Sequence, residues 1–229
     1  MSDVPTTGVR PPAPSAAQAA PITSRPTRCT GVILAGGPAT RFGGRPKGLA
    51  HVRGIRVIDR VADALRAATD ELLLVANDPA AVSWLADVTV AADVRPGLGS
   101  LGGLLTALVR ARSPVVVVAW DMPFVPGGLL RELRRVGETD GYDVVVPVSG
   151  STRGFEPLCA YYTEACAPAI GRRLDADDRR VISFYDDVRV GRLDSEVVRR
   201  FGDPGHIFLN INRPQDLDAA EGLTDAANG

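Results

Sequence analysis

Short runs of β-favouring apolar residues alternate with segments of helical hydrophobic period along most of the chain. The apolar runs are Thr30–Ala35, Glu71–Ala76, Val88–Ala91, Val115–Ala119 and Asp143–Pro147. Helical spacing of apolar residues separates them, over Ile55–Ala68, Leu101–Ala111 and Leu129–Val136. Strands that alternate with helices form right-handed βαβ units. The sequence therefore predicts an α/β fold built on a single, doubly wound and mostly parallel sheet.

Composition sets the limits of this domain. Residues 1–28 are rich in Pro, Ala, Ser and Thr and show no hydrophobic period, which predicts a disordered N-terminal tail. Residues 29–222 carry the alternating pattern without a linker-like interruption, and we expect them to form one domain. Residues 223–229 are expected to be a frayed C-terminus.

Charge and residue usage exclude several classes of protein. The formal net charge is -1, with 26 basic and 27 acidic residues, which argues against a general nucleic-acid binder. Three scattered cysteines are too few for a disulfide framework or a zinc site, and buried reduced thiols are expected. Neither an apolar run of about 20 residues nor a signal peptide is evident. These features predict a cytoplasmic protein that binds neither nucleic acid nor membrane.

The first apolar run is followed by a glycine-rich loop that contains two cations. Gly36 and Gly37 open it, and Arg41 and Lys47 supply the positive charge. Backbone amides combined with cations make a cradle for phosphate groups, whereas the alternative is a turn with solvated charges. Lys47 is the only lysine in the chain. GC-rich coding explains the arginine bias elsewhere, but not why one position keeps a compact ammonium.

Polar residues follow three further apolar runs. Asp121 comes directly after the valine-rich run 115–119, where a carboxylate can bind Mg²⁺ or, alternatively, cap the helix that begins near Pro126. Asn77 and Asp93 follow the runs at 71–76 and 88–91, where they can bind a base or ribose or simply form turns. Ligands of doubly wound sheets bind beyond the carboxyl ends of the strands, so these residues should line one site.

The ordered set of motifs resembles the molybdenum cofactor guanylyltransferases (MobA) and their MobA-like nucleotidyltransferase relatives. The resemblance covers Thr30 to Leu217, and the motifs are, in order, Leu34-Ala35-Gly36-Gly37, Arg41-Phe42-Gly43, Lys47, Asp93, Pro96-Gly97, Leu101-Gly102-Gly103, Asp121-Met122-Pro123-Phe124, Glu156-Pro157-Leu158-Cys159-Ala160 and Phe208-Leu209-Asn210-Ile211-Asn212-Arg213-Pro214-Gln215-Asp216-Leu217. Two departures are conservative in shape: Phe42 replaces the commoner methionine, and Gly99-Ser100-Leu101 replaces Gly-Pro-Leu.

The resemblance implies a Rossmann-like nucleotidyltransferase fold and transfer of GMP from MgGTP to the phosphate of molybdopterin, with release of pyrophosphate. Arg41, Lys47 and Asp121 would be catalytic, with Asp121 the Mg²⁺ ligand. Nucleotide binding is implied for Leu34, Ala35, Gly36, Gly37, Lys47, Asn77, Asp93 and Asp121. Binding of the pterin substrate is implied for Arg179, Arg180, Asn210 and Asn212.

Alternatives remain open on the sequence alone. A related nucleotidyltransferase could use CTP or another phosphorylated acceptor, although the resemblance favours GTP because CTP-using relatives tend to carry alanine in place of Gly36. A non-catalytic nucleotide-binding protein could instead deliver the cofactor. The molybdoenzyme or chaperone that receives the cofactor is a further partner implied by the resemblance.

Overall fold

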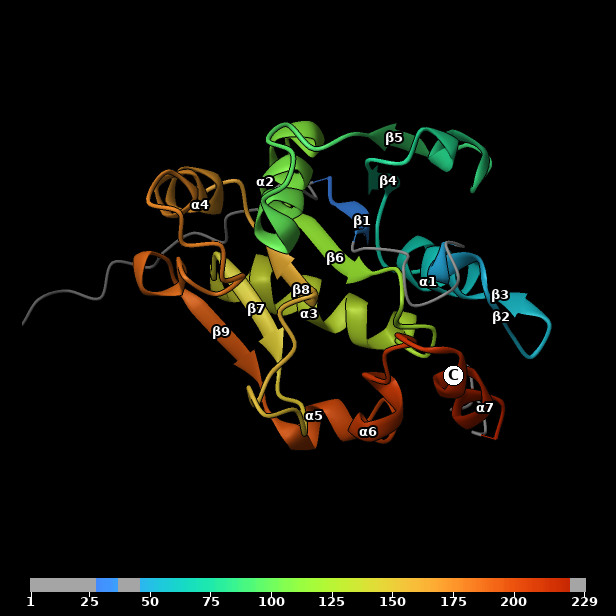
Figure 1. Ribbon diagram of the computed structural model, residues 1–229. Coiled ribbons are helices and arrows are strands. Elements are labelled where there is room, and N and C mark those ends of the chain that lie inside the picture. The colour runs from blue at the N-terminus through green and yellow to red at the C-terminus, as the bar shows by residue number, and fades with distance from the viewer. Residues whose placement is uncertain (1–27, 37–45, 223–229) are drawn as a thin grey trace, which may run out of the picture.

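A seven-stranded sheet in the order β5-β4-β1-β6-β8-β7-β9 forms the centre of the molecule (Figure 1). The computed structural model describes residues 28–36 and 46–222. The strands are β1 (Thr30–Ala35), β4 (Glu71–Ala76), β5 (Thr89–Ala91), β6 (Val115–Ala119), β7 (Val144–Pro147), β8 (Cys159–Tyr162) and β9 (Val190–Leu193). Among the described strands of this seven-stranded sheet, only β8 pairs antiparallel with its neighbours, β6 and β7. The predicted α/β class and mostly parallel sheet are therefore confirmed.

Helices cover both faces of the sheet. The helices are α1 (Val57–Arg66), α2 (Gly99–Ala111), α3 (Gly127–Asp140), α4 (Cys166–Asp175), α5 (Ser195–Arg199), α6 (Pro204–Ile207) and α7 (Pro214–Glu221), with 3-10 turns η2 (Lys47–Leu49), η3 (Pro79–Ser83) and η4 (Tyr185–Asp187). One apolar core lies between α1, α3 and one face, and a second lies between α2, α4 and the other. None of the helices within the described ranges is long and apolar enough to cross a membrane.

Burial on both faces explains why the strands read as continuous apolar runs. In β6, alternate valines point into opposite cores: Val116 and Val118 pack with α1 and α3, whereas Val115 and Val117 pack with α2 and α4. All of these valines are fully buried. Strands that are covered on both sides need no polar alternation. The continuous apolar run 115–119 therefore predicted the limits of this strand correctly.

Element boundaries differ from the sequence-based expectation where a turn intervenes. The helix expected from Ile55 begins at Val57, because Ile55–Arg56 (β3) pairs with His51–Val52 (β2) in a small hairpin. Arg53 and Gly54 both have positive φ angles, of 53° and 75°, as a tight hairpin turn requires. Helices α2 and α3 extend beyond the expected ranges, and β5 and β7 each begin one residue later.

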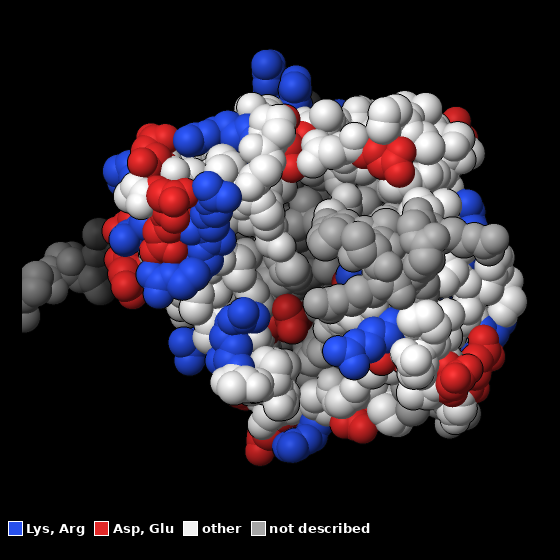
Figure 2. Space-filling model, in the orientation of Figure 1, with Lys and Arg blue, Asp and Glu red and all other residues white. Residues whose placement is uncertain are grey.

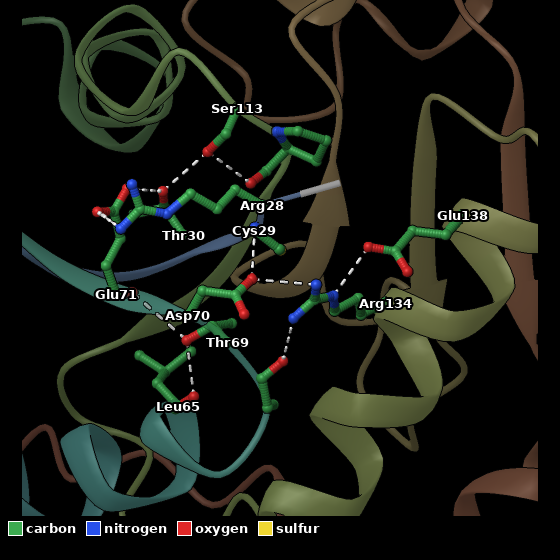
Figure 3. A network of polar contacts seen from close by, with 12 residues as sticks. Arg28, Cys29, Thr30, Leu65, Thr69, Asp70, Glu71, Ser113, Arg134 and Glu138 are labelled. Atoms are coloured by element: carbon green, nitrogen blue, oxygen red, sulfur yellow. Dashed lines mark hydrogen bonds and ion pairs between the residues drawn. The ribbon is translucent and has the colours of Figure 1, made fainter. Parts of the chain in front are cut away.

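At the amino edge of the sheet, side chains tie the strand beginnings together (Figure 3). The Cys29 backbone N–H donates to Asp70 Oδ2 at 2.8 Å, and Arg134 of α3 pairs with the same carboxylate at 3.0 Å. The Thr30 hydroxyl joins Glu71 at 3.0 Å and Ser113 at 2.8 Å. This network links the starts of β1, β4 and β6 to helix α3.

The three cysteines are free thiols within buried surroundings. Burial raises the pKa of Cys29 and of Cys166 to about 12, and it also raises that of Cys159. The expectation of buried, reduced thiols agrees with this placement.

Candidate functional site

A cavity of about 490 Å³ opens at the carboxyl edge of the sheet, where β1, β4 and β6 end. The end of β1 contributes Leu34, Ala35 and Gly36, and the turn after β6 contributes Trp120 and Asp121. Ligands of doubly wound sheets bind at this edge. Figure 2 shows the hollowed face, on which most charged side chains lie at the rim.

Lys47, in the turn η2, joins two parts of the chain that are distant in sequence. Its Nζ forms a salt bridge with Asp121 Oδ2 and donates to Asn212 Oδ1 at 2.9 Å. The lysine and aspartate side chains are 18% and 10% exposed, so water screens this pair little. The resemblance implied nucleotide binding for Lys47 and Asp121 and pterin binding for Asn212. In the structure, Lys47 contacts both of the other side chains.

Asp121 has a carboxylate that the protein satisfies only in part. The residue is 7% exposed, and its buried Oδ1 has no hydrogen-bond partner among residues 28–36 and 46–222, whereas Oδ2 contacts Lys47. Helix α3 is capped at Pro126 without a side-chain hydrogen bond, so Asp121 does not serve as the helix cap that the sequence left open. An unpartnered buried carboxylate oxygen is costly and fits a site that receives a cation.

The backbone around Asp121 is fixed by the C-terminal part of the chain. The Ile211 N–H donates to the Asp121 carbonyl oxygen at 2.9 Å. Asp216 in the first turn of α7 accepts from the Asn212 and Arg213 N–H groups at 2.7 and 2.8 Å. These bonds place Asn212 against Lys47, while Asn210 lines the cavity.

Lys47 also depends on a close contact between Gly48 and Trp120. A Cβ atom at Gly48 would lie 2.4 Å from Trp120 Cε3, closer than side chains pack. Trp84 stacks on Trp120 with ring centroids 5.3 Å apart, which limits movement of the indole. The glycine therefore lets the lysine-bearing turn lie directly on the aromatic floor of the cavity.

Asn77 and Asp93 bond to each other at the other end of the cavity. Asn77 Nδ2 donates to Asp93 Oδ2 at 2.7 Å, and the Asp93 N–H donates to Asn77 Oδ1 at 2.8 Å. Both residues line the cavity. Asn77 and Asp93 therefore form the turn-type hydrogen bonds that the sequence allowed, and they also face the cavity.

The glycine-rich loop before α2 brings backbone groups to the cavity. Gly97 and Gly99 have positive φ angles, of 81° and 64°, which glycine adopts without strain. Both residues and Ser100 line the cavity at the N-terminus of a 13-residue helix. Free N–H groups and the helix dipole favour an anion at such a position.

Arg179 and Arg180 lie outside the cavity lining. Arg179 Nη1 donates to the Gly97 carbonyl at 3.2 Å, so it supports the loop that borders the cavity. Arg180 pairs with Asp178 at 2.6 Å, and this hydrogen-bonded guanidinium lowers the pKa of Asp178 to about 2. Gly37 and Arg41 lie outside the described residues.

Glu156 lines the same cavity, although the sequence alone did not single it out as a site residue. It is 8% exposed, and burial raises its pKa. The hydrogen bond from the Leu158 N–H and the positive charge of Arg153 oppose this increase, whereas the negative charge of Asp121 adds to it. Its position in the Glu156-Pro157 motif, just before an apolar run, was the available signal. The described cavity lining therefore holds three carboxylates, of Asp93, Asp121 and Glu156, against one cation, Lys47.

The fold and this arrangement of lysine, carboxylate and glycine-rich loops define a nucleotidyltransferase. The family model for the MobA-like NTP transferase domain matches residues 31–190. The chain belongs to this family, as the resemblance of its motifs predicted.

Known relatives extend over almost the whole described chain. A molybdenum cofactor guanylyltransferase of Desulfosudis oleivorans is 36% identical over 200 residues, which cover 86% of this chain and 96% of the relative. A second, from Shewanella frigidimarina, is 32% identical over 80% of this chain and 91% of its own. The molybdopterin-guanine dinucleotide biosynthesis protein A of Archaeoglobus fulgidus superposes with a TM-score of 0.72 at 30% identity, covering 84% of this chain and 96% of that chain.

Proposed function

We propose that this protein transfers GMP from GTP to the terminal phosphate of molybdopterin and releases pyrophosphate. The observation that carries the proposal is the contact of Lys47 with both Asp121 and Asn212 at the carboxyl edge of the sheet. Relatives that align over most of the chain are named molybdenum cofactor guanylyltransferases, which supports guanylyl transfer as the activity.

The donor nucleotide would lie over β1, β4 and β5. Leu34, Ala35 and Gly36 would contact the guanine through their backbone, and Asn77 and Asp93 would bind the nucleoside. The start of α2 would accept phosphate oxygens through its free N–H groups. Gly37 and Arg41 are proposed to complete this half as nucleotide and triphosphate ligands.

The acceptor would approach from the β6–β8 side. Asn210 lines the cavity there, and Asn212 is held beside Lys47. Arg179 and Arg180 would act at the rim, where Arg179 already supports the Gly97 loop. Their exposed guanidinium groups suit an anionic substrate.

Residues of this chain fit a divalent cation, for which Mg²⁺ is the candidate. Within the described residues, Asp121 offers a buried carboxylate oxygen without a hydrogen-bond partner, and Asn210, which lines the cavity, offers an amide oxygen. The amide oxygen of Asn212 is also close but accepts a hydrogen bond from Lys47. Mg²⁺ prefers oxygen ligands and takes one or two carboxylates together with substrate phosphates. When bound, it would neutralise negative charge on the phosphate oxygens.

The chemistry asks little covalent work of the protein. An oxygen of the acceptor phosphate attacks the α-phosphorus, a new P–O bond forms, and the bond to the β-phosphate oxygen breaks as pyrophosphate leaves. Because the acceptor is already an anion, no general base is needed. Lys47 would hold the triphosphate and stabilise charge on the departing group, and catalysis rests on such positioning and charge stabilisation.

The direct test measures pyrophosphate release from each of the four nucleoside triphosphates, with and without molybdopterin. We expect release that requires both GTP and molybdopterin, together with a guanine dinucleotide product. Preference for CTP would assign the chain to a sister activity. Bound nucleotide without any release would indicate a delivery protein.

A further inference from the structure

Glu156 is a buried carboxylate for which the proposed reaction gives no role. It is 8% exposed and lines the same cavity as Asp121. Among residues 28–36 and 46–222, no arginine or lysine forms an ion pair with it. Its Oε1 accepts a long hydrogen bond from the Leu158 N–H, at 3.4 Å, and Arg153 attracts it without forming an ion pair. Buried carboxylates are rarely left so poorly compensated unless a ligand completes them.

The backbone that carries Glu156 is held on several sides. Its N–H donates to the Pro147 carbonyl at 3.0 Å, and its own carbonyl accepts from Cys159 at 3.3 Å. The next carbonyl, of Pro157, accepts a 2.7 Å hydrogen bond from the Tyr162 hydroxyl. A carboxylate on so fixed a segment cannot retreat to solvent by a small shift of the chain.

Neighbouring aromatic side chains hold the preceding residue. Phe155 stacks with Tyr185 at a centroid distance of 6.0 Å, and the Arg192 guanidinium lies 5.1 Å from the Phe155 ring centroid. Stacking of this kind resists rotation of the peptide on either side of Phe155. The carboxylate of Glu156 is thus presented to the cavity by a rigid support.

Strand register brings Glu156 close to Asp121. Strands β6 and β8 pair Val118 with Cys159, and the Ala119 N–H donates to the Leu158 carbonyl at 2.8 Å. Two positions beyond Ala119 and Leu158 in opposite chain directions are Asp121 and Glu156. Both residues lie in the turns that follow β6 and precede β8, at the carboxyl end of β6, where both line the cavity and the charge of Asp121 acts on Glu156.

Two neighbouring carboxylates repel each other and a triphosphate unless a cation lies between them. Lys47 contacts Oδ2 of Asp121, and the buried Oδ1 has no hydrogen-bond partner among the described residues. The Glu156 carboxylate forms no ion pair there, although the positive charge of Arg153 attracts it. We propose that Glu156 is a second carboxylate ligand of the divalent cation that Asp121 binds. This inference rests on the metal-dependent transfer proposed above.

Mn²⁺ binding to the full-length protein tests the ligand assignment without using activity. Free Mn²⁺ is measured by electron paramagnetic resonance as the metal is titrated, alone and with a non-hydrolysable GTP analogue. We expect Glu156→Gln to weaken binding by about tenfold or more, because it removes a charged ligand. Glu164→Gln is the matched control, since Glu164 is exposed beyond the opposite end of β8.

Thermal unfolding separates a metal ligand from a structural residue. For a ligand, Glu156→Gln should leave the metal-free Tm unchanged or raise it, because an unpaired buried charge is removed. The Tm increase that saturating Mn²⁺ gives the wild type should become smaller. A structural role would lower the metal-free Tm and leave Mn²⁺ affinity unchanged, which overturns the inference. Glu156→Asp keeps a carboxylate and should retain more of the affinity than Glu156→Gln.

The inference and the proposed function can fail separately. Unchanged Mn²⁺ affinity in Glu156→Gln, together with lost affinity in Asp121→Asn, would overturn the role of Glu156 and leave guanylyl transfer standing. Glu156-dependent Mn²⁺ binding in a protein that transfers no guanylyl group would overturn the proposed function and leave the ligand assignment standing. A wild-type protein without Mn²⁺ binding, even with the GTP analogue, would overturn the inference.

Discussion

The two edges of the sheet differ in how fully their carboxylates are paired: those at the amino edge are partly exposed and bonded, whereas those at the carboxyl edge are buried and incompletely bonded. At the amino edge, Asp70 accepts from the Cys29 N–H and pairs with Arg134, which also pairs with Glu138 (Figure 3). At the carboxyl edge, within the described residues, Asp121 keeps an oxygen without a hydrogen-bond partner, and Glu156 forms no ion pair. Satisfied polar networks stabilise a fold, whereas unsatisfied groups mark places where a ligand completes the structure. The comparison predicts that mutations at one edge change stability and that mutations at the other change turnover.

The largest expected effect is the loss of turnover on removal of the charges at the carboxyl edge. We expect Lys47→Ala and Asp121→Ala each to lower guanylyl transfer by about 10²–10³, as is typical when a charge-stabilising group is lost. Steady-state rates measure this effect, and a cooperative thermal transition should persist in both variants. Near-wild-type transfer by either variant would remove that residue from the mechanism.

Lys47→Arg sharpens the same prediction. Arginine keeps the positive charge but replaces a compact ammonium by a wider planar group. We expect reduced kcat in this variant, because the lysine fits between Asp121 and Asn212. Full activity of this variant would mean that the position does not need a lysine, and that coding bias alone explains the single lysine.

Gly48→Ala is expected to have the next largest effect on turnover. The added Cβ would meet the Trp120 ring at 2.4 Å, so either the lysine turn or the indole must shift. Displacement of a positioning element by about 1 Å can cost up to about 100-fold in rate, and we expect a loss of about tenfold or more. Gly171→Ala is the control, because nothing lies within 4 Å of a Cβ at that helical glycine.

At the amino edge we expect a change in stability alone. Asp70→Ala leaves the Cys29 N–H without its acceptor and takes one carboxylate from Arg134, a loss of about 1–3 kcal/mol in the free energy of unfolding. Urea denaturation measures it, and kcat should stay at the wild-type value. Asp63→Ala, which breaks the exposed pair with Arg66, should cost less than about 0.5 kcal/mol. A large fall in kcat for Asp70→Ala would contradict the division between the two edges.

The smallest expected effect concerns the reactivity of the cysteine thiols, and we expect it to be the same at both edges of the sheet. Cys29 lies at the amino edge and Cys159 at the start of β8, and burial raises the pKa of both thiols. The reactive thiolate is therefore scarce at pH 8, since the pKa of Cys29 is about 12. We expect almost no reaction with a disulfide reagent until denaturant is added, followed by the release of three thiols. Fast labelling of the native protein would show that one edge opens.

Periodicity predicted the parallel core well because it depends on burial alone. The limits of β1, β4 and β6 follow from runs of apolar residues that both cores cover. The pairing of Lys47 with Asn212, 165 positions apart, could not follow from any local pattern. The same holds for Glu156, which becomes a cavity residue only through the antiparallel pairing of β8 with β6.

The hairpin of β2 and β3 illustrates the limit of helical spacing. Ile55 continues the apolar period of α1, yet it is 47% exposed and belongs to a strand. The positive φ angles at Arg53 and Gly54 settle its conformation before the helix begins. An apolar period therefore identifies a helix more reliably than it locates the helix start.

The reversed direction of β8 gives the two sides of the cavity different freedom to vary in length. Parallel strands must be joined by a crossover, so each donor-side loop belongs to a connection that returns the chain across the sheet, through a helix or, between β4 and β5, through the 3-10 turn η3. The connection 148–158 instead leaves β7 and enters β8 at the same edge, without any crossing. Doubling the length of such a loop costs only about 0.6 kcal/mol in closure entropy. Insertions in the connection 148–158, beside Glu156, should therefore cost the least folding free energy. They would change the shape of this side of the cavity without altering the loops after β1, β4 and β5.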